Sequence, residues 1–317
     1  MTCYDVFNGD ADGICALQQL RLSAPTDAVR VTGLKRDISL LDRVEAQPGD
    51  EITVLDISLD KNRASLERVF NQGARVFYAD HHFFDQPPAH VNLDLHLDTS
   101  PNTCTSLIVN EYLGGAQARW AVVGAFGDNL DVAATKLGQS AGLTEYELIA
   151  CKQLGVCLNY NGYGFRLDDL MFHPTDLYAL LSPYRNPSDF MQHESGYTAL
   201  KNQYKNDLEH SKTQRLVSGT ESGAIYSLPD QSWARRIIGV MGNDLAKQFP
   251  NRAHALLIDM GDGHYQVSVR APYHARSGAD QLCRQFESGG GRKAAAGINR
   301  LPENMLDRFI DQFNCAF

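Results

Sequence analysis

The chain has 317 residues, of which 43% are hydrophobic and 21% charged, and its 29 Lys and Arg face 38 Asp and Glu. These ordinary values exclude a chain that is disordered throughout, and the length indicates two domains at ~100–200 residues per domain. A formal net charge of −9 argues against a protein that coats long nucleic acid through general electrostatics.

The sequence carries no feature of an exported or membrane protein. No apolar run approaches the roughly 20 residues that a membrane span needs. The first residues lack the basic stretch followed by an apolar one that marks a signal peptide. The seven cysteines are odd in number and none are paired in C-x-x-C spacing, which is typical of reduced thiols. We therefore expect a cytoplasmic protein.

Short apolar runs alternate with helical patterns in the first part of the chain. The patterns predict strands at 3–7, 29–33, 52–57 and 74–79, and helices at 14–22, 61–70 and 105–113. The apolar run 121–126 is interpreted as a buried strand or the start of a helix. Because strands that alternate with helices form βαβ units, this part predicts a parallel sheet covered by helices.

The sequence pattern changes twice in the rest of the chain. A helical pattern at 144–156 is followed by a stretch rich in aromatic and turn residues, and then by polar, helix-compatible residues at 189–215. Strand patterns return at 224–228, 254–260 and 265–270, with helical patterns at 233–249, 280–286 and 302–313. We predict an α/β fold with a parallel-sheet domain over 1–185, a helical connector over 186–216 and a smaller α/β domain over 217–317.

Acidic residues follow four of the predicted elements, each interpreted as a strand. They are Asp10 with Asp12, Asp56, Asp80 with two histidines, and Asp128. The carboxyl ends of parallel strands meet at one edge of a sheet, so these side chains are expected to converge. Converging carboxylates repel unless cations neutralise them, and carboxylate with imidazole suits Mn²⁺. A lone D-x-D-G is usually only a turn, but four such clusters predict metal-assisted phosphoester hydrolysis.

Five motifs give these clusters a family context. They are N-G-D-A-D-G (8–13), L-D-I-S (55–58), D-H-H (80–82), G-A-F-G-D (124–128) and G-G-G-R-K-A-A-A-G (289–297). With these motifs in this order, the chain resembles the DHH phosphoesterases, which include RecJ-type exonucleases, nanoRNases and cyclic-dinucleotide phosphodiesterases. The stretch 135–215 carries no motif of that family.

The resemblance implies two Mn²⁺ ions, with Mg²⁺ or Co²⁺ as alternatives. Asp10 and Asp56 would hold one ion. The other ion would bind Asp12, His81 and Asp128, with Asp56 bridging both. His82 would face the scissile phosphate, and Asp80 would orient a histidine. His82, Asp80 and Asp56 are therefore the expected catalytic residues.

Two positions depart from the family pattern. The family supplies another ligand four or two residues before Asp10, where this chain has Val6 and Asn8. Valine cannot bind a metal, so Asn8 remains the candidate, as a neutral and weaker ligand. In the last motif Arg292 stands where the family has histidine, and arginine still recognises phosphate.

The C-terminal part holds the expected substrate-binding residues. Residues 264–300 contain six Lys and Arg against two acids, which indicates a surface for an anionic ligand. Glycines allow backbone N–H groups to approach a ligand closely. The candidates are Arg270, Gly289, Gly290, Gly291, Arg292 and Lys293. The hydroxyl residues of T-C-T-S at 103–106 are interpreted as helix caps.

These observations predict a hydrolase that cleaves phosphodiester bonds of short oligonucleotides or linear dinucleotides through metal-activated water, in a cleft between two domains. The alternatives are a pyrophosphatase- or polyphosphatase-like hydrolase and a catalytically weakened nucleotide-binding protein. We expect a small phosphorylated substrate, no long nucleic acid and no membrane partner. The sequence leaves the oligomeric state open, with a homodimer as one possibility.

Overall fold

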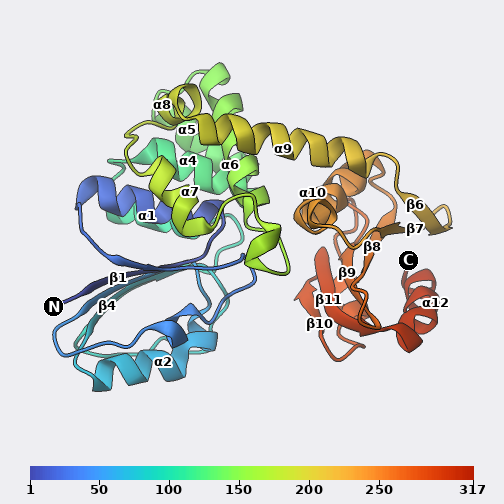
Figure 1. The fold of residues 1–317 in the computed structure, drawn as a ribbon, viewed down its shortest axis with the longest axis horizontal. Helices are drawn as coiled ribbons and strands as arrows, with labels where there is room; N and C mark the ends of the chain where they lie inside the picture. Colours follow the sequence, from blue (N-terminus) through green and yellow to red (C-terminus); the bar gives the residue numbers. More distant parts are fainter. The chain divides into compact units, whose positions relative to one another are not determined.

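A computed structural model describes residues 1–317 and divides them into two compact units, Met1–Asn202 and Gln203–Phe317. In the first unit, five strands form an entirely parallel sheet in the order β2-β1-β3-β4-β5 (Figure 1). The strands are β1 (Cys3–Phe7), β2 (Val29–Val31), β3 (Glu51–Leu55), β4 (Arg75–Asp80) and β5 (Leu93–Leu97). The predicted parallel sheet is confirmed. Strand β5, L-D-L-H-L, was not predicted from the sequence.

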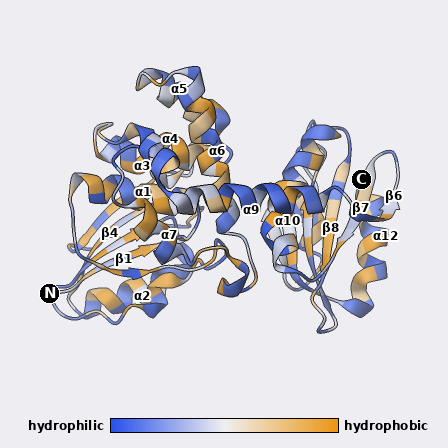
Figure 2. Ribbon diagram, turned by 45° about the horizontal axis from the view of Figure 1, so that its top comes forward, coloured by the Kyte–Doolittle hydropathy of each residue, from blue (hydrophilic) through white to orange (hydrophobic).

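Helices cover both faces of this sheet. Helix α1 (Ala11–Ser23) lies on one face and α2 (Leu59–Asn71) on the other (Figure 1). Alternate strand residues such as Val6, Val54 and Val76 point into a buried apolar cluster that also contains Leu66 of α2. Figure 2 shows that hydrophilic and hydrophobic residues are interspersed along α2. Because successive side chains of a strand point to opposite faces, the same strands also present side chains to α1.

The remaining helices of this unit are α3 (Thr105–Tyr112), α4 (Ala118–Gly127), α5 (Asp131–Ser140), α6 (Glu145–Asn161), α7 (Pro174–Leu181) and α8 (Pro187–His193). Of these, α3, α4, α6 and α7 pack on α1, α5 packs on α4, and α8 packs on α4 and α6. The run 121–126, to which the sequence analysis gave a strand end before Asp128, lies inside helix α4. Every residue from Trp120 to Gly127 is buried. The run is therefore apolar throughout and lacks the alternation of polar and apolar residues by which a helix is distinguished from a strand in a sequence.

The second unit is built on a mixed sheet of six strands in the order β10-β11-β9-β8-β7-β6. These are β6 (Arg215–Gly219), β7 (Gly223–Leu228), β8 (Ala253–Asp259), β9 (His264–Arg270), β10 (Gly289–Arg292) and β11 (Ala295–Pro302). Only β7 and β8 are parallel neighbours. Helix α9 (Ser195–Ser211) spans the boundary between the two units along the chain.

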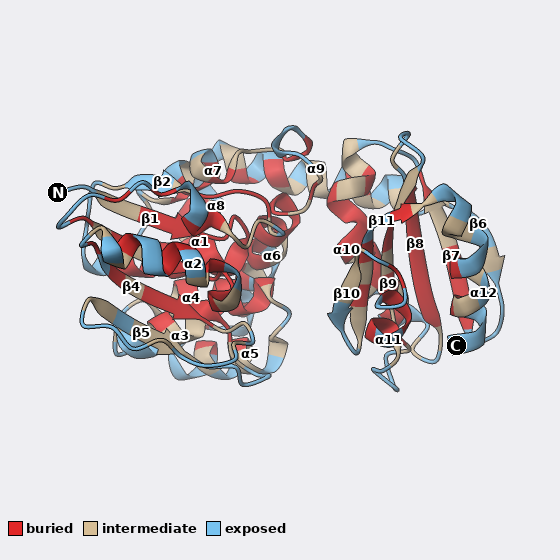
Figure 3. Ribbon diagram, turned by 90° about the horizontal axis from the view of Figure 1, so that it is seen from below, coloured by how far each residue is buried: buried red, intermediate tan, exposed pale blue.

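Helices also enclose the second sheet. Helix α10 (Ser232–Gln248) packs on β8 and β9, and the opposite face forms a core with α11 (Ala279–Cys283) and α12 (Leu306–Ala316). The central strand β8 is almost wholly buried (Figure 3). The two-domain α/β prediction is confirmed. None of the helices combines the length and the apolar composition required to cross a membrane.

Candidate metal and phosphate site

The acidic residues gather where the strand order of the first sheet reverses. The chain runs from β1 outward to β2 and then returns to β3 on the other side of β1. In open α/β sheets, this switch point at the carboxyl ends of the strands is where ligands bind. Asp56 directly follows β3 with a positive φ of 58°, a left-handed conformation that Asp and Asn adopt more readily than most residues.

Asp10 caps the helix that follows β1. Its Oδ1 accepts hydrogen bonds from the backbone N–H groups of Asp12 (3.0 Å) and Gly13 (3.2 Å). Its Oδ2 forms an ion pair with Nζ of Lys35. Burial opposes the ionisation of Asp10, but Lys35 and the Gly13 N–H outweigh it and hold the pKa of Asp10 below its ordinary value. Both carboxylate oxygens of Asp10 are therefore engaged.

The start of α3 holds two further acids. Backbone N–H groups of Thr105 and Ser106 donate to the two carboxylate oxygens of Asp12 at 2.8 and 2.7 Å. The Thr105 hydroxyl donates to Oδ1 of Asp56 at 3.1 Å. The T-C-T-S residues, which the sequence analysis interpreted only as caps, thus bind and orient site carboxylates. Burial and the neighbouring carboxylates raise the pKa of Asp12, and raise that of Asp56 further.

His81 lies at the centre of the acids. Its Nε2 is 3.4 Å from Oδ1 of Asp56, 3.7 Å from Oδ2 of Asp128 and 4.0 Å from Oδ2 of Asp12. Burial acts to lower the pKa of His81, but these carboxylates raise it to about 10. The surrounding carboxylates therefore favour the protonated form of His81 where no metal is bound. A metal ion that binds its nitrogen must displace this proton.

Asp80 and His82 form a separate pair beside this centre. Oδ1 of the buried Asp80 lies 2.7 Å from Nδ1 of His82. This contact fixes the orientation of the His82 ring, whose Nδ1 is 4.0 Å from Oδ1 of Asp56. Asp80 was expected from the sequence to orient a histidine, and His82 is the histidine in contact with it.

The residues present fit a divalent cation. Two sets of donor atoms each lie within 4.8 Å of one another: Asp12, His81 and Asp128 in one set, and Asp56, His81 and His82 in the other. Carboxylate oxygen with imidazole nitrogen is a donor set that suits Mn²⁺. His82, expected to face phosphate, is thus also within reach of a metal.

Three polar residues complete the site, and two of them were missed from the sequence. Lys35 follows β2, the strand next to β1. The rule that residues after parallel strands meet at one edge of the sheet, which predicted the acidic cluster, therefore also applied to Lys35. Its Nζ is 2.8 Å from Oδ1 of Asn159 on α6, a residue with no local sequence signal. Asn8 binds within the loop, since its Oδ1 accepts from the Asp10 N–H (3.3 Å) and its Nδ2 donates to the Lys35 carbonyl (3.1 Å).

The substrate-binding candidates lie in the second unit. Arg292, Ala295 and Arg270 are directly paired across β10, β11 and β9, so both arginines point to one face of the sheet about 10 Å apart. This is the face of α10, where Arg270 donates to Oδ1 of Asn243 at 2.7 Å. Arg292 and Lys293 are exposed.

The three glycines are not a free loop, because they form strand β10 of a hairpin. A Cβ atom on Gly289 would lie 1.7 Å from the Cys283 carbonyl oxygen, and Gly291 has a φ of 137°. Packing and backbone conformation therefore account for these two glycines, whereas a Cβ atom on Gly290 would have open space around it. Of the three glycines expected to approach a ligand, Gly290 alone is unexplained by packing or backbone conformation.

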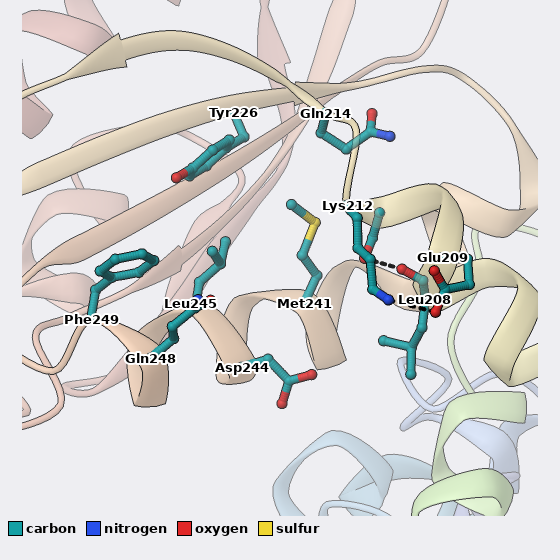
Figure 4. A pocket seen from close by; sticks show the side chains of 11 residues that line it. Leu208, Glu209, Lys212, Gln214, Tyr226, Met241, Asp244, Leu245, Gln248 and Phe249 are labelled. Atoms are coloured by element: carbon teal, nitrogen blue, oxygen red, sulfur yellow. Dashed lines mark hydrogen bonds and ion pairs between the residues drawn. The ribbon is translucent and has the colours of Figure 1, made fainter.

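A cavity of about 580 Å³ lies elsewhere in the second unit, between the end of α9, β7 and α10 (Figure 4). Its wall combines apolar side chains such as Tyr226, Met241 and Phe249 with the Lys212–Glu209 ion pair. None of the candidate site residues lines it.

Comparisons with known proteins agree with this description. Residues 221–317 match the DHHA1 domain, and the sequence matches none of the curated proteins. The fold is similar to that of the exonuclease RecJ bound to manganese, with a TM-score of 0.66 and 16% identity over 99% of this chain and 90% of that one. It is also similar to RecJ from Thermus thermophilus in complex with Mn²⁺ (TM-score 0.64, 17% identity), where 99% of this chain aligns with 51% of the other.

A third solved structure matches over the full length of both chains. It is the pGpG-specific phosphodiesterase PggH from Vibrio cholerae, with a TM-score of 0.58 and 14% identity. At these identities the likeness concerns the fold. Together with the DHHA1 domain it confirms the resemblance to the DHH phosphoesterases that the motifs indicated.

Proposed function

We propose that this protein hydrolyses phosphodiester bonds with the help of a divalent metal ion. The proposal builds on its fold and its C-terminal domain, which are similar to those of the DHH phosphoesterases. One observation carries the proposal. Asp12, Asp56 and Asp128 converge on Nε2 of His81 at 3.4–4.0 Å, at the switch point of a parallel sheet. Buried carboxylates in such a cluster repel one another, and a bound cation removes that cost.

The proposal assigns different roles to the side chains of the site. Asp12, Asp56, His81 and Asp128 would hold the ion, and the sequence-based assignment of Asp10 and Asn8 as metal ligands stays a prediction. When bound, a divalent ion supplies a Lewis acid for the phosphoryl oxygen and a lower pKa for attacking water. His82 donates a hydrogen bond to the phosphate, and Asp80 holds its ring for that purpose. The proposed ion is Mn²⁺, and the sequence-based expectation of two ions stays a prediction.

The proposed substrates are short oligonucleotides or linear dinucleotides. Arg270, Arg292 and Lys293, with the backbone of Gly289–Gly291, would bind the end of the substrate remote from the cleaved bond. A net charge of −9 disfavours long nucleic acid. The full-length match to a protein described as a pGpG-specific phosphodiesterase supports dinucleotides as the first substrates to test.

The test is Mn²⁺-dependent release of mononucleotides from pGpG and from oligoribonucleotides of increasing length, with pyrophosphate in parallel. We expect cleavage of the shortest linear substrates, and its loss in the Asp56→Asn variant. Cleavage of pyrophosphate alone would favour a pyrophosphatase. Binding of dinucleotide without turnover would refute the enzymatic proposal and favour a nucleotide-binding protein.

A further inference from the structure

The ammonium group of Lys35 lies beside Asp10, where the family resemblance puts the first of two metal ions. Its Nζ pairs with Oδ2 of Asp10 and lies 2.8 Å from Oδ1 of Asn159 and 3.5 Å from Oδ1 of Asp128. An ammonium group has three donors and no acceptor. The three surrounding oxygens therefore match its donors in number, and two of them belong to carboxylates.

The backbone holds Lys35 in this position. Its N–H donates to the carbonyl of Gly162 after α6 at 2.9 Å, and its carbonyl accepts from Nδ2 of Asn8 at 3.1 Å. The loop after β1 also packs tightly on the loop after β2, since a Cβ atom on Gly9 would lie 1.9 Å from the Gly33 carbonyl oxygen. Lys35 is thus fixed by contacts at both of its ends.

Apart from Asp56, which the other ion shares, the donors that a first ion would need are already engaged. Asp10 uses Oδ1 to cap α1 and Oδ2 to bind Lys35. Val6 offers no ligand atom, and the Asn8 amide is hydrogen-bonded to the Asp10 N–H and the Lys35 carbonyl. Neither set of clustered donor atoms includes Asp10. The donors of the other ion, Asp12, His81 and Asp128, do form such a set.

We infer that Lys35 replaces the first metal ion, so that the chain binds a single divalent ion, at Asp12, Asp56, His81 and Asp128, beside a permanent ammonium group. The inference rests on the proposed function for that ion and departs from the sequence-based expectation in the number of ions. A second divalent ion at Asp10 would meet the ammonium at close range, and like charges repel. The ammonium partly neutralises the four carboxylates but cannot activate water as a metal does.

The decisive measurement counts bound Mn²⁺ in the full-length protein. Metal-free protein is dialysed to equilibrium against Mn²⁺, the bound metal is quantified by mass spectrometry, and the electron paramagnetic resonance spectrum is recorded. We expect one Mn²⁺ per chain with the spectrum of an isolated ion. Two ions with an exchange-coupled spectrum, as a pair about 3.5–4 Å apart would give, would overturn the inference and leave the proposed function intact. Absence of tight Mn²⁺ binding would overturn both.

A matched pair of variants tests the role of the ammonium itself. Lys35→Met keeps the length of the side chain and removes its charge, so we expect a second Mn²⁺ to bind. Lys152→Met removes a lysine of the same unit that pairs with Asp131 at 2.9 Å, and should leave the count at one. A folded Lys35→Met protein that still binds one ion would refute the replacement. If that variant fails to fold, the count in the unaltered protein still decides between one ion and two.

Discussion

The close approach of α4 and α6 leads to a prediction about Gly155. A Cβ atom at this position would lie 2.4 Å from the Val123 carbonyl oxygen and 2.8 Å from the Gly127 backbone nitrogen. Both obstacles are backbone atoms, so no rotation of a side chain relieves the contact. In Gly155→Ala, the two helices must therefore separate. Gly127 directly precedes Asp128, so the displacement reaches the candidate metal site.

The expected magnitude combines two opposing effects. Overpacking of a core costs typically ~1–3 kcal/mol, and immovable backbone puts this case at the upper end. Replacing a glycine inside a helix by alanine favours the helix by about 1 kcal/mol. We expect a net loss of about 2 kcal/mol in the free energy of unfolding of the first unit. At about 2–4 °C per kcal/mol for a unit of this size, its melting temperature should fall by about 4–8 °C.

The assay is thermal and denaturant unfolding followed by circular dichroism, together with Mn²⁺ affinity. Gly138→Ala on α5 is the matched control, because the one close contact of its added Cβ would be with a methyl carbon of Leu148, at 2.4 Å, which can rotate away. We expect this control to keep the stability of the unaltered protein. Gly155→Ala protein as stable as the control would refute the close contact between α4 and α6.

Three further predictions concern charge. Asp56→Asn should raise the melting temperature of the metal-free protein while abolishing turnover, because burial and neighbouring Asp12 raise the pKa of Asp56 well above its ordinary value; a lower melting temperature would contradict this. Arg292→Ala should raise KM for a dinucleotide more than it lowers kcat, and an unchanged KM would remove Arg292 from the substrate site. Burial, aided by Arg252, lowers the pKa of His254 to about 4. The unfolded state therefore binds more protons below about pH 6.5, and stability should fall by up to roughly 3 kcal/mol as the pH drops to 4. Denaturant unfolding of His254→Leu should show a shallower fall, and an equal fall would contradict the assignment.

The sequence by itself determined the class of the fold and most residues of the candidate metal site. Strand and helix patterns alternate in the first unit, so the parallel sheet follows from local periodicity, and its topology brings Asp10, Asp56 and His81 to one edge. The carboxyl ends of parallel strands share an edge, and this rule suffices to bring these residues together. The run 121–126 is a helix and not a strand, but Asp128 at the end of that helix still lies beside His81.

Tertiary structure decided which groups hydrogen-bond to the site residues and that Lys35 pairs with Asp10. Thr105 and Ser106 reach Asp12 across more than 90 positions of the sequence. Asn159 meets Lys35 across 124. No local pattern encodes contacts of this separation, because they depend on how whole helices pack on the sheet. The ion pair of Lys35 with Asp10 arises in the same way, since it requires two loops to meet at Gly9 and Gly33.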